Sequence, residues 1–172
     1  MNNKAFFDSN IFIYGFTNDD NTKRDIVFEL LDSYNPVISA QVIKKFTNVL
    51  TKKFNIEYDY AISKAKEIIA ISEFVTEDKD LVFAAFDVIE RFNYSLFDSF
   101  LIAAALNSNC TIFYSEDLQD GQIIDNTLKI INPFNDSLII KKNTRQRRAK
   151  VSLEERFKDW NGDYTEIINT DN

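Results

Sequence analysis

The feature that most constrains the fold is a short apolar run that ends in an aspartate near the start of the chain. Ala5, Phe6 and Phe7 lead directly into Asp8, and small polar residues follow. A short apolar run bounded by polar residues predicts a buried strand, which places Asp8 at its carboxyl end. Ligands bind at this edge of open α/β sheets, and a buried carboxylate needs a cation or several hydrogen-bond donors. Asp8 therefore either belongs to a binding site or caps a helix that begins near Asn10.

A second apolar run repeats this pattern late in the chain. Residues 111–114 are followed by Ser115, Glu116 and Asp117. Because the carboxyl ends of parallel strands meet at one edge of a sheet, we expect Asp117 to emerge beside Asp8.

Asp98 is the third candidate carboxylate. It shares a helical stripe with Leu101, Ile102 and Ala105, so we expect it to face the sheet rather than water. Ser95 and Asp98 also have the spacing of a capping box, which is the structural alternative for Asp98.

Strand and helix patterns alternate along the first 134 residues. Only 3 glycines and 2 prolines are present, which favours long helices over a turn-rich all-β fold. The expected helices are 22–33 with Thr22 as cap, a helix capped by Ser39, 57–71, 78–92 and 95–106, and the other expected strands are 37–38, 74–75 and 128–131. The alternation predicts an α/β protein with a mostly parallel sheet sandwiched by helices.

The absence of histidine narrows the chemistry. A Ser-His or Cys-His nucleophile and a His-ligated zinc site are both excluded. Three carboxylates at one edge repel one another unless a cation neutralises them, and Mg²⁺ or Mn²⁺ prefers oxygen ligands of this kind. The net charge of −7 argues against a nucleic-acid partner in general, but a set of metal-binding carboxylates would also produce it.

Several polar residues lie near these acids in the sequence. Asn10 and Ser115 are expected to support the carboxylates or to contact phosphate. Glu116 and Asp120 are either further members of the acidic site or solvated loop charges.

Four stretches together resemble the motifs of the PIN-domain family, in particular VapC-type toxins of bacterial toxin–antitoxin systems. The stretches are residues 7–11, 38–46, 96–105 and 115–121. The resemblance covers residues 1–134 and implies a PIN-like nuclease domain. It further implies a metal-dependent endoribonuclease with Asp8, Asp98 and Asp117 as catalytic and metal-binding residues. The expected cofactor is Mg²⁺ or Mn²⁺, the expected substrate is tRNA or rRNA, and the expected assembly is a homodimer.

Lys45 departs from the family pattern, which usually has a glutamate there. A positive charge should weaken metal binding in a partly dehydrated cleft. Lys45 therefore indicates an impaired nuclease, or a catalytically silent scaffold that binds RNA or a partner protein. The sequence does not support another doubly wound protein with an acidic Mg²⁺ site, such as a phosphatase or a receiver domain. Neither the motif expected after the aspartate of the first strand nor a lysine at the end of a late strand is evident.

Residues 135–172 form a segment of different composition. The basic residues Lys141, Lys142, Arg145, Arg147, Arg148 and Lys150 precede a helical stripe of Leu153, Phe157 and Trp160. A short helix with such a stripe is not stable alone and must dock. The segment resembles the tail of AbrB/MazE-type antitoxins, that is, a basic linker followed by a toxin-binding helix.

This resemblance implies an inhibitory role for the tail. Arg145, Arg147 and Arg148 are the candidates to pair with the acidic site, because guanidinium and carboxylate groups pair strongly. The partner would be either a cognate antitoxin or this antitoxin-like tail itself. No apolar run approaches the length of a membrane span and no signal peptide is evident, so we expect a cytoplasmic protein without a membrane partner.

Overall fold

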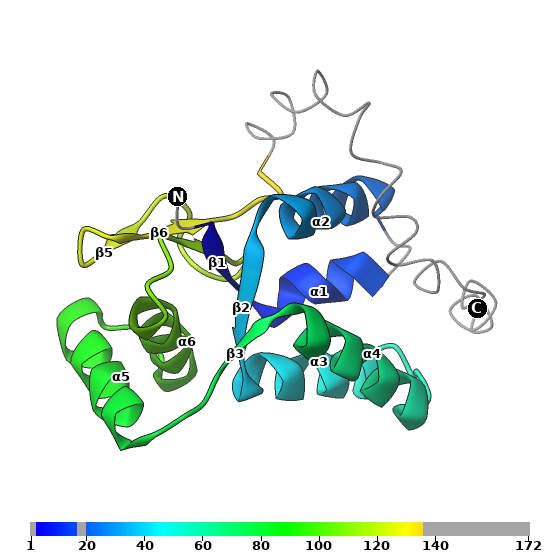
Figure 1. Cartoon of the computed structure of the whole chain (residues 1–172), viewed down its shortest axis with the longest axis horizontal. Helices are drawn as coiled ribbons and strands as arrows, with labels where there is room; N and C mark the ends of the chain where they lie inside the picture. The colour runs from blue at the N-terminus through cyan, green and yellow to red at the C-terminus, as the bar shows by residue number, and fades with distance from the viewer. Residues whose placement is uncertain (1–2, 17–19, 136–172) are drawn as a thin grey trace.

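The chain forms a six-stranded sheet with helices on both faces (Figure 1). The computed structural model describes residues 3–16 and 20–135. The strands are β1 (Lys4–Phe7), β2 (Asn35–Ser39), β3 (Glu73–Val75), β4 (Ile112–Tyr114), β5 (Ile123–Ile124) and β6 (Leu128–Ile131). Their order is β3-β2-β1-β4-β6-β5, and only the pairing of β5 with β6 is antiparallel. The predicted α/β class with a mostly parallel sheet is confirmed.

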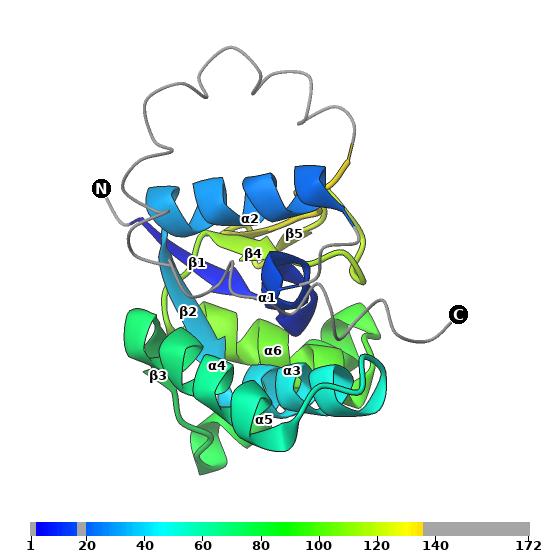
Figure 2. The same ribbon diagram turned by 90° about the vertical axis from the view of Figure 1, so that its right-hand side faces the viewer.

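Helices connect most of the strands and cover both faces of the sheet. They are α1 (Ser9–Phe16), α2 (Asn21–Ser33), α3 (Ala40–Lys52), α4 (Tyr58–Ile71), α5 (Lys79–Phe92) and α6 (Leu96–Asn107). Figure 1 shows α1 to α4 on one side of β1 and β2 and α5 and α6 on the other, and Figure 2 looks onto the side formed by α1 to α4. Phe6 and Phe113 stack edge to face at the centre of the sheet, with ring centroids 5.0 Å apart, and both are fully buried.

Helix starts follow the sequence signals, but two of the expected caps differ. Thr22 does not cap α2, because the carboxylate of Asp20 accepts hydrogen bonds from the backbone N–H groups of Thr22 and Lys23. Asp78 caps α5 in the same way through the N–H of Leu81. Ser39 holds the cap position of α3, but its side chain makes no cap hydrogen bond.

The register of the central strands determines where the acids lie. β1 and β4 pair in parallel with Phe7 opposite Tyr114, and the N–H of Asp8 donates to the carbonyl of Tyr114 at 3.0 Å. Asp8 and Ser115 therefore leave the sheet side by side at its carboxyl edge.

Two short elements complete the fold, the helix that the sequence offered as one alternative after Asp8 and an edge strand that it did not predict. The residues after Asp8 form α1, and β5 lies at the edge of the sheet as a strand of two residues. No helix in the described part of the chain is long and apolar enough to cross a membrane. The expected tail helix, with Leu153, Phe157 and Trp160, lies outside the described residues.

Candidate acidic site

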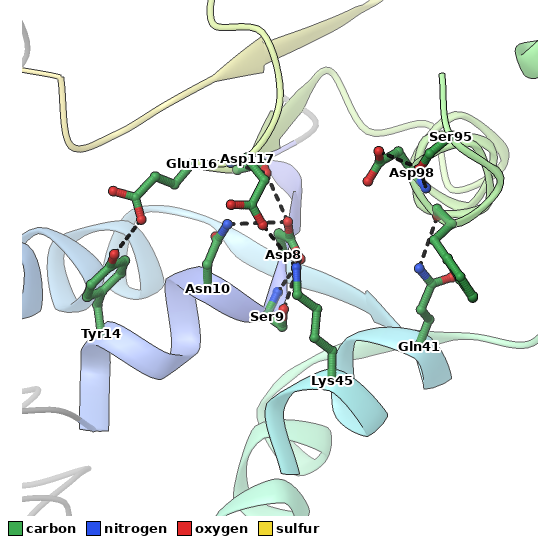
Figure 3. A network of polar contacts seen from close by, with 12 residues as sticks. Asp8, Ser9, Asn10, Tyr14, Gln41, Lys45, Ser95, Asp98, Glu116 and Asp117 are labelled. Atoms are coloured by element: carbon green, nitrogen blue, oxygen red, sulfur yellow. Dashed lines mark hydrogen bonds and ion pairs between the residues drawn. The ribbon is translucent and has the colours of Figure 1, made fainter. Parts of the chain in front are cut away.

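Asp8 lies at the junction of β1 and α1, directly before the first residue of the helix. Its carboxylate is almost fully buried, and one oxygen accepts from the N–H of Ser9 at 2.6 Å and from its hydroxyl at 3.1 Å. The other oxygen accepts from Ser115 Oγ at 2.9 Å and from Asn10 Nδ2 at 3.4 Å. Four donors thus fix the Asp8 carboxylate at the carboxyl edge of the sheet, and Figure 3 shows Ser9 and Asn10 beside it.

Lys45 brings a positive charge to the same place from α3. Its Nζ donates to Asp117 Oδ2 at 2.9 Å and lies 3.9 Å from Asp8 Oδ1. The ammonium therefore contacts both strand-end carboxylates, as Figure 3 shows. The structure brings Asp8 and Asp117 to the same edge of the sheet, where one ammonium reaches both.

The charges of Asp8 and Lys45 respond to opposing effects. Burial raises the pKa of Asp8, and this outweighs the lowering by Lys45 and by the hydrogen bonds from Ser115 and Ser9. Burial lowers the pKa of Lys45. Attraction to Asp8, the hydrogen bond to Asp117 and the charge of Asp98 raise it by more than burial lowers it. The net result is a raised pKa, so Lys45 remains an ammonium at neutral pH.

Asp98 lies in the first turn of α6 and bonds with the capping residue Ser95, close to its structural alternative. Ser95 Oγ donates to Asp98 Oδ2 at 2.6 Å and accepts from the N–H of Asp98 at 3.2 Å, at the start of α6. Asp98 is half-buried rather than turned fully inward, and Figure 3 shows its carboxylate beside Ser95, apart from Asp8 and Asp117. Its charge reaches Lys45, but its oxygens do not join the other two carboxylates.

Glu116 follows Ser115 directly but turns away from Asp8. Tyr14 Oη donates to Glu116 Oε2 at 2.5 Å, and Lys23 Nζ lies 2.5 Å from Glu116 Oε1. Lys23 also lies 4.0 Å from the centre of the Tyr14 ring. Because Lys23 and Glu116 are 93 residues apart, no local spacing in the sequence could have indicated this pair.

Asp120 stabilises the end of the domain instead of joining the acidic site. Its carboxylate accepts from the N–H of Asn132 at 2.8 Å and from Asn135 Nδ2 at 2.7 Å. Phe134, between these two asparagines, is buried against Tyr14, with ring centroids 4.9 Å apart. Arg145, Arg147 and Arg148, the expected inhibitory residues, lie outside the described part of the chain.

The fit of a divalent cation depends on the oxygens that remain available. Asn10 Oδ1 is buried and has no hydrogen-bond partner among the described residues, which favours a cation nearby. However, the described residues contain no group of three or more cysteine, aspartate or glutamate side chains placed to hold a metal ion. Lys45 holds Asp117, and Ser95 holds Asp98. As placed, these residues do not fit Mg²⁺, which requires near-ideal octahedral oxygen coordination.

The PIN-domain family profile matches residues 5–119, which span the strands and helices that carry these side chains. The chain belongs to the PIN-domain family. A search of curated protein sequences found no match.

Solved structures with the same PIN fold come from toxin–antitoxin systems. A toxin–antitoxin complex from Klebsiella pneumoniae aligns with a TM-score of 0.59 at 16% identity, covering 76% of this chain and 98% of that one. VapBC2 from Rickettsia felis, bound to a DNA fragment from its promoter, gives 0.56 at 14% identity, covering 75% and 99%. VapC20 from Mycobacterium tuberculosis, described as a toxin that cleaves the sarcin–ricin loop, gives 0.54 at 16% identity, covering 66% and 91%. At these identities the likeness establishes the PIN fold.

Proposed function

We propose that this PIN-domain protein is the endoribonuclease toxin of a type II toxin–antitoxin system, with its activity limited by Lys45. The observation that carries the proposal is that buried Asp8 and Asp117 lie at the carboxyl edge of the sheet within reach of one positive charge, that of Lys45. Membership of the family and the toxin neighbours support an action on RNA. We propose Asp8, Asp98 and Asp117 as the catalytic residues, Mg²⁺ or Mn²⁺ as the cofactor and structured RNA as the substrate.

Two contacts must change before Asp8, Asp98 and Asp117 can act together. Lys45 must leave Asp117, and the carboxylate of Asp98 must leave Ser95. Both contacts stabilise an arrangement in which the three carboxylates cannot bind the same metal ion. We therefore expect slow cleavage by the wild-type chain.

The Lys45→Glu variant tests this activity directly. Restoring a carboxylate at residue 45 removes the ion pair, so we expect Mg²⁺-dependent cleavage of tRNA or rRNA to accelerate at least about tenfold. Cleavage products on a denaturing gel are the measurement. Lys44→Glu, which changes the neighbouring exposed lysine on α3, is the charge-matched control, and Lys45→Glu with Asp8→Asn is the inactive control.

Two results would contradict this account in different ways. Equal and rapid cleavage by the wild-type chain and Lys45→Glu would remove the limiting role of Lys45. If neither cleaves RNA while both bind it, the chain is the second candidate, a PIN scaffold that binds RNA or a protein without cutting. The ion pair of Lys45 with Asp117 is the observation that favours this second function.

We also propose an inhibitory partner, which is either a cognate antitoxin or residues 136–172 of this chain. The tail carries the basic residues and the apolar stripe described above, and it follows a domain end fixed by Asp120 and Phe134. A tethered segment has an effective concentration in the millimolar range, so a weak contact would be sufficient.

Deleting residues 136–172 tests the tail. We expect the shortened chain to cleave RNA faster if the tail inhibits in cis. Light scattering of the full and shortened chains gives their oligomeric states and so tests the expected homodimer. A version with Arg145, Arg147 and Arg148 changed to glutamine separates the basic residues from the apolar stripe. Unchanged cleavage and oligomeric state after the deletion would argue for an uninvolved tail.

A further inference from the structure

The acidic site contains a positive charge that is covalently part of the chain. Lys45 Nζ donates to Asp117 Oδ2 at 2.9 Å and lies 3.9 Å from Asp8 Oδ1, so a single ammonium contacts acids that follow two neighbouring strands, β1 and β4. Asp8 is 2% exposed. A carboxylate in such surroundings needs a compensating charge, and Lys45 supplies it.

This arrangement differs from that of a site prepared for a metal ion. An empty metal site leaves carboxylates that repel one another, so metal binding relieves the repulsion and stabilises the fold. Here the three acids Asp8, Asp98 and Asp117 already have one positive charge among them. A divalent ion that approached Asp8 and Asp117 would meet the ammonium at close range and would have to displace it.

The neighbouring acids are also engaged. Asp98 accepts from Ser95 Oγ at 2.6 Å, and Glu116 is held by Lys23 and Tyr14, each at 2.5 Å. Lys23 at Glu116 and Lys45 at Asp117 thus hold two consecutive acids from two different helices, α2 and α3. The edge of the sheet is stabilised by side chains of the protein itself.

We propose that Lys45 is the resident cation of this site, taking the place of the divalent ion. The folded wild-type chain then neither requires nor tightly binds Mg²⁺ or Mn²⁺ at Asp8 and Asp117. Removal of the Lys45 charge converts the same carboxylates into a metal site. This inference concerns the site of the proposed function and deepens it, but it does not depend on whether RNA is cleaved.

Metal binding to the full-length chain tests the resident cation, with Mn²⁺ alone as the probe. Isothermal titration calorimetry gives the affinity, and the melting temperature in EDTA and in excess Mn²⁺ gives the effect on stability. Lys45→Gln removes the charge but keeps much of the side-chain length, and Lys45→Met is a second neutral variant. Lys44→Gln makes the same change in net charge at the adjacent exposed residue of α3.

The expected results separate the variants clearly. The wild-type chain and Lys44→Gln should bind Mn²⁺ weakly and melt at the same temperature with EDTA or Mn²⁺. Lys45→Gln should bind Mn²⁺ at least about tenfold more tightly, because a like charge no longer opposes the ion. Its melting temperature should be lower than that of the wild type in EDTA and should rise when Mn²⁺ is added. A further Asp117→Asn change should abolish both the gain in Mn²⁺ affinity and this rise in melting temperature.

Two outcomes would overturn the inference. One is tight Mn²⁺ binding by the wild-type chain, which can be measured even if the Lys45 variants fail to fold. The other is a folded Lys45→Gln or Lys45→Met variant with no gain in affinity. If the Lys45 variants gain Mn²⁺ affinity but no variant cleaves RNA, the inference about Lys45 holds and the ribonuclease proposal fails. If the wild-type chain binds Mn²⁺ tightly and cleaves RNA rapidly, the ribonuclease proposal holds and the inference about Lys45 fails.

Discussion

Asp8 combines an unfavourable environment with a fixed position. Burial raises its pKa despite Lys45 and the hydrogen bonds from Ser115 and Ser9. A carboxyl group whose pKa is higher in the folded state than in the unfolded state destabilises the fold as pH rises above the unfolded value. The charge of Asp8 is therefore maintained at the expense of stability, which is typical of residues kept for function.

Asp8→Asn should raise the free energy of unfolding at pH 7, because the neutral amide avoids the burial of a charge. The gain should shrink as pH falls through the folded-state pKa and vanish below the ordinary aspartate value, where Asp8 is protonated in both states. Urea unfolding at pH 7 and near pH 3 measures both quantities. A variant that is less stable than the wild type at pH 7 would show that the ion pair with Lys45 outweighs the effect of burial.

At the residue scale, the sequence predicted the acids better than their partners. The two apolar runs that end in acids were enough to place Asp8 and Asp117 together, because parallel strands align their carboxyl ends. The spacing of Ser95 and Asp98 allowed two interpretations, and in the structure Ser95 caps α6 and its hydroxyl donates to the Asp98 carboxylate. The contact between Lys45 and Asp117 spans 72 residues and arises only from tertiary packing.

Helix starts show how the same signal can have different effects. Asp78 and Ser39 both precede helices that the sequence predicted. Asp78 accepts from the N–H of Leu81 at 2.9 Å. Ser39 Oγ is buried without a hydrogen-bond partner among residues 3–16 and 20–135. Residue type alone cannot distinguish these cases, because side-chain direction depends on the packing around β2.

The two helix caps give a matched pair of substitutions. Asp78→Ala should lower the free energy of unfolding by about 1 kcal/mol, since the N–H of Leu81 loses its acceptor. Ser39→Ala should leave it unchanged or raise it by up to about 1 kcal/mol, because a buried hydroxyl without a partner is removed. Chemical denaturation of both variants at the same pH is the measurement. A large loss of stability in Ser39→Ala would indicate a partner for this hydroxyl beyond the described residues.

At the scale of elements, length determined what the sequence could predict. The long amphipathic helices and the apolar strands were recognised from their periodicity. β5, with two residues, is too short to carry a periodic signal, and it is defined by its pairing with β6. The short α1 follows Asp8 so closely that its apolar residues could not be separated from the strand before it.

The whole molecule has a single cysteine, and its position makes it a probe of global unfolding. Cys110 is 3% exposed, and burial, reinforced by Glu73, raises its pKa to about 12. The thiolate is the reactive form, so iodoacetamide at pH 8 should label the folded chain at least about a hundredfold more slowly than a free thiol. Mass spectrometry with and without denaturant measures this difference. Rapid labelling under native conditions would mean that the region around β4 opens locally.

Lys45 can be replaced by glutamate through a single mutation of its codon. Every lysine codon differs from a glutamate codon only in its first base, so a single A-to-G transition replaces the ammonium with a carboxylate. The ion pair with Asp117 would then become a repulsion between like charges. A form with four carboxylates, at residues 8, 45, 98 and 117, is therefore one point mutation away from this chain. It would arise as often as any single base change, and selection could then favour or remove it.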